Sequence, residues 1–160
     1  MRVRLHLIIL IFIAISASVI CGCDNGEKSI FHNIPPEGWA YGDTLYFKVS
    51  DADSTSITTG DIIVVIRHSN AYEFSNIWLN LRYFTEDTLV NDTVNLRLAD
   101  DYGNWYGKGM GVSYQRTDTV ARHVSIDASR PIKAWHIMRA DTLPDIEQVG
   151  VIFTTTNNQK

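Results

Sequence analysis

Hydrophobic and polar residues alternate along most of the chain after residue 40. In residues 77–84, for example, Leu79 and Leu81 fall on one side, and Asn80 and Arg82 fall on the other. A period of two places alternate side chains on opposite faces of a strand, so each such run predicts a β-strand with one buried face. The pattern recurs at residues 43–50, 77–84, 92–99, 121–127, 131–139 and 148–155.

One further run differs because it is apolar throughout. Residues 62–66 read Ile-Ile-Val-Val-Ile, which predicts a central strand covered on both faces, although a buried helical turn has the same signature. Turn-forming Pro, Gly, Asn and Asp residues separate the runs. We therefore predict an all-β fold, an antiparallel β-sandwich of about seven to nine strands.

The N-terminus has the three parts of a secretory signal. Arg2 and Arg4 precede an uncharged apolar run at residues 7–15, and small residues follow at 16–18. A retained membrane span is the alternative, but a span needs roughly 20 apolar residues. Because this run is shorter, we predict a signal peptide at residues 1–22.

The two cysteines lie one residue apart where the apolar run ends. A metal site would need further ligands at fixed spacing, and none accompany Cys21 and Cys23. The stretch around them instead resembles the bacterial lipobox, in which a small residue precedes the lipidated cysteine. Gly22 is small whereas Ile20 is bulky, so we predict that Cys23 carries the lipid and that Cys21 leaves with the signal.

The remaining chain is long enough for one domain. We predict a lipid anchor and tether at residues 23–36, a β-sandwich domain at 37–156 and a disordered tail at 157–160. The formal net charge of the chain is −4, and the signal carries arginines but no acidic residue. An acidic domain is repelled by the negatively charged phosphate backbone, so nucleic acid is excluded as a partner. The membrane, reached through the lipid, is expected.

We find no motif for catalysis. Ser69 follows His68, but neighbours along a strand point to opposite faces. His123 and His136 also lie in strand runs, where a lone histidine is usually packed or simply exposed. The glycines near residue 107 lack the spacing of nucleotide-binding loops. We expect a protein that is not an enzyme and that uses no metal and no cofactor.

Two tryptophans are out of step with the apolar faces of their strands. Trp78 and Trp135 either lie on an exposed sheet face, or both faces are covered and the rings are buried. Exposed rings on a sandwich would suit a sugar or protein ligand. A sugar-binding envelope lipoprotein is therefore the alternative to a protein-interaction module.

Several stretches together resemble the gliding motility lipoprotein GldH family of the Bacteroidetes. The resemblance covers about residues 23–155 and is most specific in Leu96–Gly111, which ends in Trp-x-Gly-x-Gly-x-Gly. The lipobox, the early Gly38-Trp39 and the closing run Leu143–Gly150 also match. The polar insert near residues 53–59 departs from the family pattern. The resemblance implies a non-enzymatic accessory of the gliding and type IX secretion apparatus in the cell envelope, with envelope proteins as partners.

The segment Asp100–Gly111, here called the glycine loop, is the candidate working surface. Glycine offers no side chain for packing, and it persists where backbone needs positive φ or approaches another chain. Aromatic residues anchor protein interfaces, and a lysine adds positive charge. The alternative is a structural loop whose tryptophan plugs the end of the sandwich. The candidate partner-binding residues are Asp101, Trp105, Tyr106 and Lys108.

A recurrent Asp-Thr or Asp-Ser dipeptide is the last feature of the sequence. It resembles the O-glycan acceptor pattern of secreted Bacteroidetes proteins, although Asp-Thr also favours turns and strand starts. The candidate acceptors are Thr44, Ser54, Thr88, Thr93, Thr119 and Thr142.

Overall fold

The structure, a computed structural model, describes residues 26–50 and 56–156. These ranges form eleven strands and no helix. Accordingly, they contain no helix with the length and apolar character that a membrane crossing requires. The strands are β1 (Glu27–Asn33), β2 (Trp39–Ala40), β3 (Leu45–Phe47), β4 (Ile57–Ser69), β5 (Asn76–Phe84), β6 (Leu89–Arg97), β7 (Lys108–Met110), β8 (Ser113–Asp127), β9 (Ile132–His136), β10 (Thr142–Leu143) and β11 (Ile146–Thr155).

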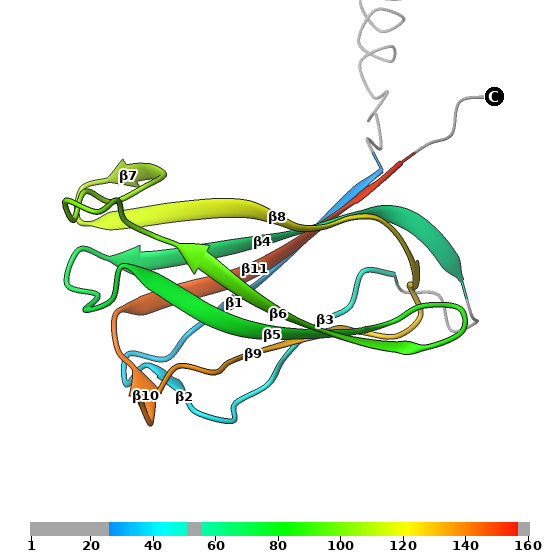
Figure 1. Ribbon diagram of the computed structural model, residues 1–160, viewed down its shortest axis with the longest axis horizontal. Helices are drawn as coiled ribbons and strands as arrows, with labels where there is room; N and C mark the ends of the chain where they lie inside the picture. The colour runs from blue at the N-terminus through cyan, green and yellow to red at the C-terminus, as the bar shows by residue number, and fades with distance from the viewer. Residues whose placement is uncertain (1–25, 51–55, 157–160) are drawn as a thin grey trace, which may run out of the picture.

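The strands form two main sheets that pack face to face (Figure 1). One sheet has five strands in the order β1-β11-β4-β8-β7, and the other has four in the order β3-β9-β5-β6. A short β2–β10 pair adds a third, two-stranded sheet. All strand pairs are antiparallel. The predicted antiparallel β-sandwich is confirmed, and the pattern in residues 61–68 is that of the central strand β4.

Alternating side chains fill the space between the two sheets. Leu79 and Leu81 on β5 and Ile132 on β9 face Val64 on β4 and Val151 on β11, and each is at most 1% exposed. Burying each of these side chains contributes about 1.5–3 kcal/mol relative to leaving it in water. The period-two runs in the sequence therefore identify the inner faces correctly.

The N-terminal boundary of the sandwich differs from the prediction. Strand β1 lies inside residues 23–36, where a tether was expected, and pairs along β11 from Glu27 opposite Thr154 to Asn33 opposite Gln148. As an edge strand it exposes most of its side chains, so its hydrophobic signal is weak. The sandwich begins at β1 rather than at residue 37. Cys23, Ser54 and the tail at 157–160 lie outside the described residues.

The region around residues 107–117 forms a strand pair rather than an irregular loop. Strand β7 pairs with the start of β8, and β8 continues through irregular pairings with β4 near Gly60 and Ile62. His123, in this irregular part of β8, has a φ of 53°. These irregularities let one long strand follow the twist of the sheet.

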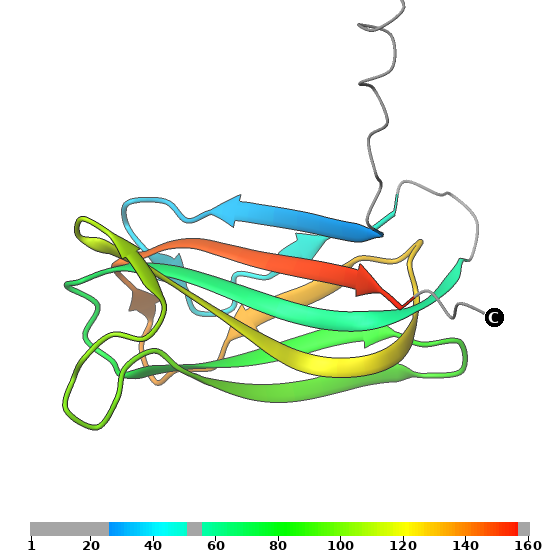
Figure 2. The same cartoon turned by 90° about the horizontal axis from the view of Figure 1, so that it is seen from above.

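The two ends of the sandwich differ in what they carry. The first described residue, Gly26, accepts a hydrogen bond from the amide of Thr155 at one end. The glycine loop lies at the opposite end in both views (Figures 1 and 2). Strand β11 runs between these ends, and at about 3.3 Å per residue its ten residues span roughly 30 Å.

Candidate functional site

The glycine loop follows β6 of one sheet, includes β7 and leads into β8 of the other sheet. An isolated bridge between Ala99 and Trp105 closes the first turn, and the Tyr106 amide donates to the Leu98 carbonyl at 2.7 Å. The loop therefore leaves and rejoins the sandwich at fixed points. Its tip, between these points, is free to face solvent.

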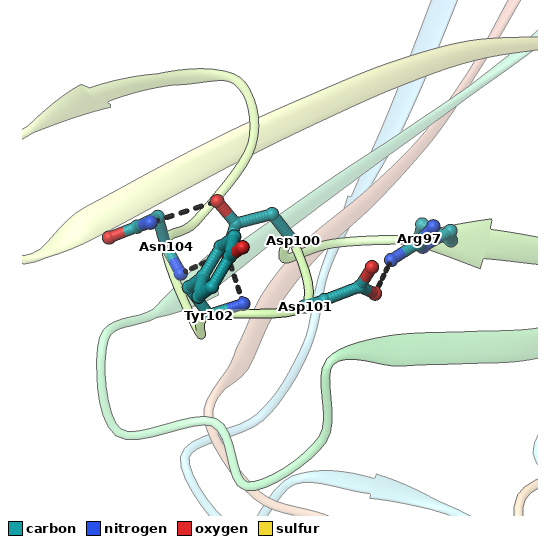
Figure 3. A network of polar contacts seen from close by, with 5 residues as sticks. All are labelled: Arg97, Asp100, Asp101, Tyr102 and Asn104. Atoms are coloured by element: carbon teal, nitrogen blue, oxygen red, sulfur yellow. Dashed lines mark hydrogen bonds and ion pairs between the residues drawn. The ribbon is translucent and has the colours of Figure 1, made fainter.

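Asp100 organises this tip (Figure 3). Its Oδ1 atom accepts hydrogen bonds from the amides of Tyr102 and Asn104, at 2.9 and 2.8 Å. Its Oδ2 atom accepts a third from the Asn104 side chain, at 2.8 Å. A carboxylate that binds backbone amides two and four residues ahead holds a tight turn in one conformation. These hydrogen bonds from Asn104 lower the pKa of Asp100 from its ordinary value of 3.8.

Because the folded pKa of Asp100 is lowered, the contribution of this turn is fully present above pH 3.8. It is lost as the pH falls below that value. We expect Asp100→Asn to loosen the turn at neutral pH, since an amide offers one acceptor oxygen in place of two. Hydrogen exchange at the amides of Tyr102 and Asn104 should become several-fold faster. Asp101→Asn is the matched control and should leave both amides protected; equal exchange in the two variants would contradict this role for Asp100.

Three loop glycines have the backbone conformation that the sequence predicts for them. Gly103, Gly107 and Gly111 have φ values of 83°, 94° and 69°, where residues with a Cβ are strained. Gly107 is also crowded, because a Cβ there would lie 2.0 Å from the Gln115 carbonyl oxygen. Glycine therefore lets the loop pass directly against β8.

Trp105 packs inward, at the end of the core. Its ring lies 4.5 Å from that of His68 and 6.2 Å from that of Tyr114, centroid to centroid. Trp105 is half-buried against the main hydrophobic cluster. This geometry is the one expected of a plug and leaves the ring little surface for a partner.

The histidine beneath Trp105 is fully buried. Its Nδ1 atom lies 2.8 Å from the Ser69 carbonyl oxygen, whereas Nε2 has no hydrogen-bond partner among the described residues. Burial lowers the pKa of His68 below its ordinary value. The sequence shows His68 only beside Ser69 and gives no sign of its contact with Trp105, because that contact is long-range.

The other candidate residues have different surroundings. Asp101 is exposed and pairs with Arg97, and Tyr106 is half-buried with the Arg116 guanidinium 5.3 Å from its ring centroid. Lys108 lies opposite Gln115 in the β7–β8 pairing, and its side chain is outside the described part of the structure. Tyr102, which the candidate set lacks, is 92% exposed. The surface of the loop thus centres on Asp101 and Tyr102.

A depression of about 580 Å³ borders the loop. Gly107 and Gly109 form one wall, and Arg67, Gln115 and Arg116 contribute side chains from β4 and β8. Both arginines of this rim are ion-paired, Arg67 with Glu147 at 3.9 Å and Arg116 with Asp118 at 3.6 Å, so the rim carries no marked positive charge. In residues 26–50 and 56–156, no three His, Cys, Asp or Glu side chains come together as metal ligands would.

The candidate acceptor threonines occupy varied positions. Thr88, in the β5–β6 turn, and Thr93, on β6, are exposed, whereas Thr44, Thr119 and Thr142 are half-buried. An acceptor hydroxyl must be reachable, so Thr88 and Thr93 are the better placed of the five. Their glycosylation stays a prediction.

The fold and the loop define a class of protein: an antiparallel β-sandwich with an ordered, glycine-rich surface loop at one end. Residues 28–152 match the family described as GldH lipoprotein. Because this match covers most of the chain, the protein belongs to the GldH lipoprotein family. Membership implies a lipid-anchored location in the cell envelope.

One curated relative and one solved structure show weaker similarity. A gliding motility lipoprotein GldH homolog from Christiangramia forsetii is 28% identical over 74 residues. That match covers 46% of this chain and 44% of the relative, so it spans less than half of either. The infectious bursal disease virus VP2 subviral particle matches 82% of this chain and 34% of its own, at 10% identity and a TM-score of 0.28. An identity and a TM-score this low support no conclusion about this protein.

Proposed function

We propose that this protein is a non-enzymatic accessory lipoprotein of the gliding motility and type IX secretion apparatus. In this proposal Cys23 carries the lipid, and the glycine loop contacts other envelope proteins. Family membership supports the motility role. The observation that most supports a contact through the loop is that Asp100 holds the loop in an ordered turn while Tyr102 is exposed to solvent.

The position of the loop supports a contact away from the membrane. Cys23 precedes Gly26 by three residues, so a lipid there is attached within roughly 10 Å of that end of the sandwich. The glycine loop lies at the opposite end, roughly 30 Å away along β11. A rigid sandwich thereby holds the loop where a partner standing off the bilayer can reach it.

The chemistry of the loop suits a protein partner. A tyrosine side chain has only two χ angles to fix on binding, and tyrosines are enriched at interface anchors. The turn formed around Asp100 means that the backbone near Tyr102 is already ordered before contact, which lowers the cost of association. Asp101 is partly neutralised by Arg97.

Gene deletion with complementation tests this proposal in a host that glides or secretes through this apparatus. We expect deletion to abolish surface spreading or to reduce secretion of type IX cargo. Wild-type protein should restore both, whereas the double variant Asp101→Ala/Tyr102→Ala should fail although it reaches the membrane in equal amount.

Tyr41→Ala is the matched control, because Tyr41 is a 63% exposed tyrosine outside the loop. It should restore spreading and secretion fully. Normal spreading and secretion in the deletion strain would refute the role in the apparatus. Full rescue by the loop variant would refute the assignment of the contact to the loop.

A further inference from the structure

The outer face of the four-stranded sheet carries the two tryptophans that the sequence left unassigned. Trp78 on β5 is 40% exposed, and Trp135 on β9 is half-buried on the same face. Tyr46 on β3 adds a third ring, 53% exposed. Of the two alternatives, the exposed sheet face is confirmed for Trp78, and Trp135 lies half-buried on that face.

The three rings lie on a diagonal across neighbouring strands. Tyr46 pairs with Lys133, and Trp135 lies two residues further along β9, opposite Asn80 of β5. Trp78 lies two residues before Asn80 on β5, which continues the same direction because β5 and β9 are antiparallel. Each step crosses one strand and advances two residues, so successive Cα atoms are roughly 8 Å apart. The diagonal forms an aromatic track rather than three scattered side chains.

Polar side chains beside the track are held in place by cross-strand hydrogen bonds. Asn76 donates to Asn95 at 2.7 Å, and Thr93 donates to Asn80 at 2.8 Å. Arg82 donates to Asn91 at 2.6 Å. These amides and hydroxyls keep further donors and acceptors for a ligand, and the pairing fixes their positions beforehand.

The charge of this face is opposite to that of the chain. No outward position of the fully described strands β3, β5, β6 and β9 carries an acidic residue. The one aspartate on β6, Asp92, faces inward and accepts a hydrogen bond from Tyr83. Arg82 and Lys133 both face outward, and neither forms an ion pair with a described carboxylate. The face therefore combines exposed rings with positive charge in a chain of net charge −4.

The cations lie against the rings. The Arg82 guanidinium is 5.1 Å from the Trp135 ring centroid, and the Lys133 ammonium is 5.2 Å from that of Tyr46. Such contacts hold a long side chain in place at an exposed site. Two shallow depressions, of about 230 and 440 Å³, adjoin Trp135 and Trp78.

We infer that this face binds an acidic polysaccharide. The C–H faces of pyranose rings pack on indole and phenol rings, the ring hydroxyls match the fixed amides, and sugar carboxylates match Arg82 and Lys133. Charge complementarity favours an acidic polymer over a neutral one. The extended diagonal suits a chain rather than a single sugar. This site is separate from the glycine loop and independent of its role.

Titration calorimetry of the lipidated, detergent-solubilised protein tests this inference, with polygalacturonate as the acidic polysaccharide, dextran as a neutral one and polyglutamate as an acidic peptide. We expect measurable binding to polygalacturonate only. Trp78→Ala/Trp135→Ala should weaken that binding roughly tenfold or more. Arg82→Gln/Lys133→Gln should weaken it and reduce its salt dependence.

Tyr102→Ala is the control, because it removes an exposed ring from the other end of the molecule and should leave binding unchanged. Thermal unfolding of each variant verifies that it is folded. If Trp78→Ala/Trp135→Ala does not fold, Arg82→Gln/Lys133→Gln still tests the inference. Three results would each overturn the inference: no binding to polygalacturonate, equal binding to polyglutamate, or unchanged binding by variants that fold.

Discussion

Trp105→Ala is expected to lower the free energy of unfolding by about 3 kcal/mol, although Trp105 lies in a surface loop. The substitution removes the ring that covers His68 and contacts Tyr114, and it leaves a cavity at the end of the core. Water would also reach the His68 ring, whose Nε2 atom has no partner in the described structure. Urea unfolding monitored by circular dichroism measures the loss.

Tyr102→Ala in the same loop is the matched control for this prediction. Because Tyr102 is 92% exposed, its removal should change the free energy of unfolding by no more than about 0.5 kcal/mol. The pair of variants separates the structural part of the loop from its surface. A small effect of Trp105→Ala, similar to that of Tyr102→Ala, would mean that Trp105 does not plug the sandwich.

Gly107→Ala should cost about 2–3 kcal/mol, the second large effect. A φ of 94° strains any residue with a Cβ, and the new methyl would meet the Gln115 carbonyl at 2.0 Å. Because the backbone fixes the position of the Cβ and the atom that it meets is a backbone carbonyl oxygen, no rotamer change relieves this contact. We expect β7 to separate from β8, which hydrogen exchange at the β7 amides would detect.

Gly103→Ala isolates the contribution of backbone strain. Gly103 also has a positive φ, of 83°, but a Cβ there would meet nothing within 4 Å. Its substitution should cost only about 1 kcal/mol and leave β7 paired. If the two alanine variants were equally stable, close approach to β8 would not be the reason for glycine at position 107.

The sequence predicts the strands best where one face of the strand is buried and the other is exposed to solvent. On β5, Leu79 and Leu81 follow the alternation and are buried as expected. The pattern fails at β1, because an edge strand buries little on either face and its residues have no reason to alternate strongly. The tether prediction was therefore wrong for Glu27–Asn33, which form β1.

Periodicity also cannot say whether the second face of a sheet is covered. It placed Trp78 and Trp135 opposite the core side chains, but only the packing of the two sheets determines that this face is open. The same limit applies to His68, whose burial depends on pairing with Tyr114 and Ile146, far away in the sequence.

Some features of the glycine loop could be predicted from its local sequence. The sequence predicted either positive φ or a close approach to another chain for the four glycines, and three of them have positive φ. The role of Asp100 could also have been read locally, since an aspartate followed by Gly103 and Asn104 is typical of a side-chain-closed turn. The inward direction of Trp105 could not, because it depends on β4 and β8 lying beneath the loop.

Site-specific photo-crosslinking in the intact envelope tests the central claim most directly. A photoreactive phenylalanine analogue at Tyr102 should form adducts with a component of the motility and secretion apparatus, identified by mass spectrometry, and the same analogue at Tyr41 should not. No adduct at Tyr102, or the same adducts at both positions, would contradict a partner contact through the glycine loop.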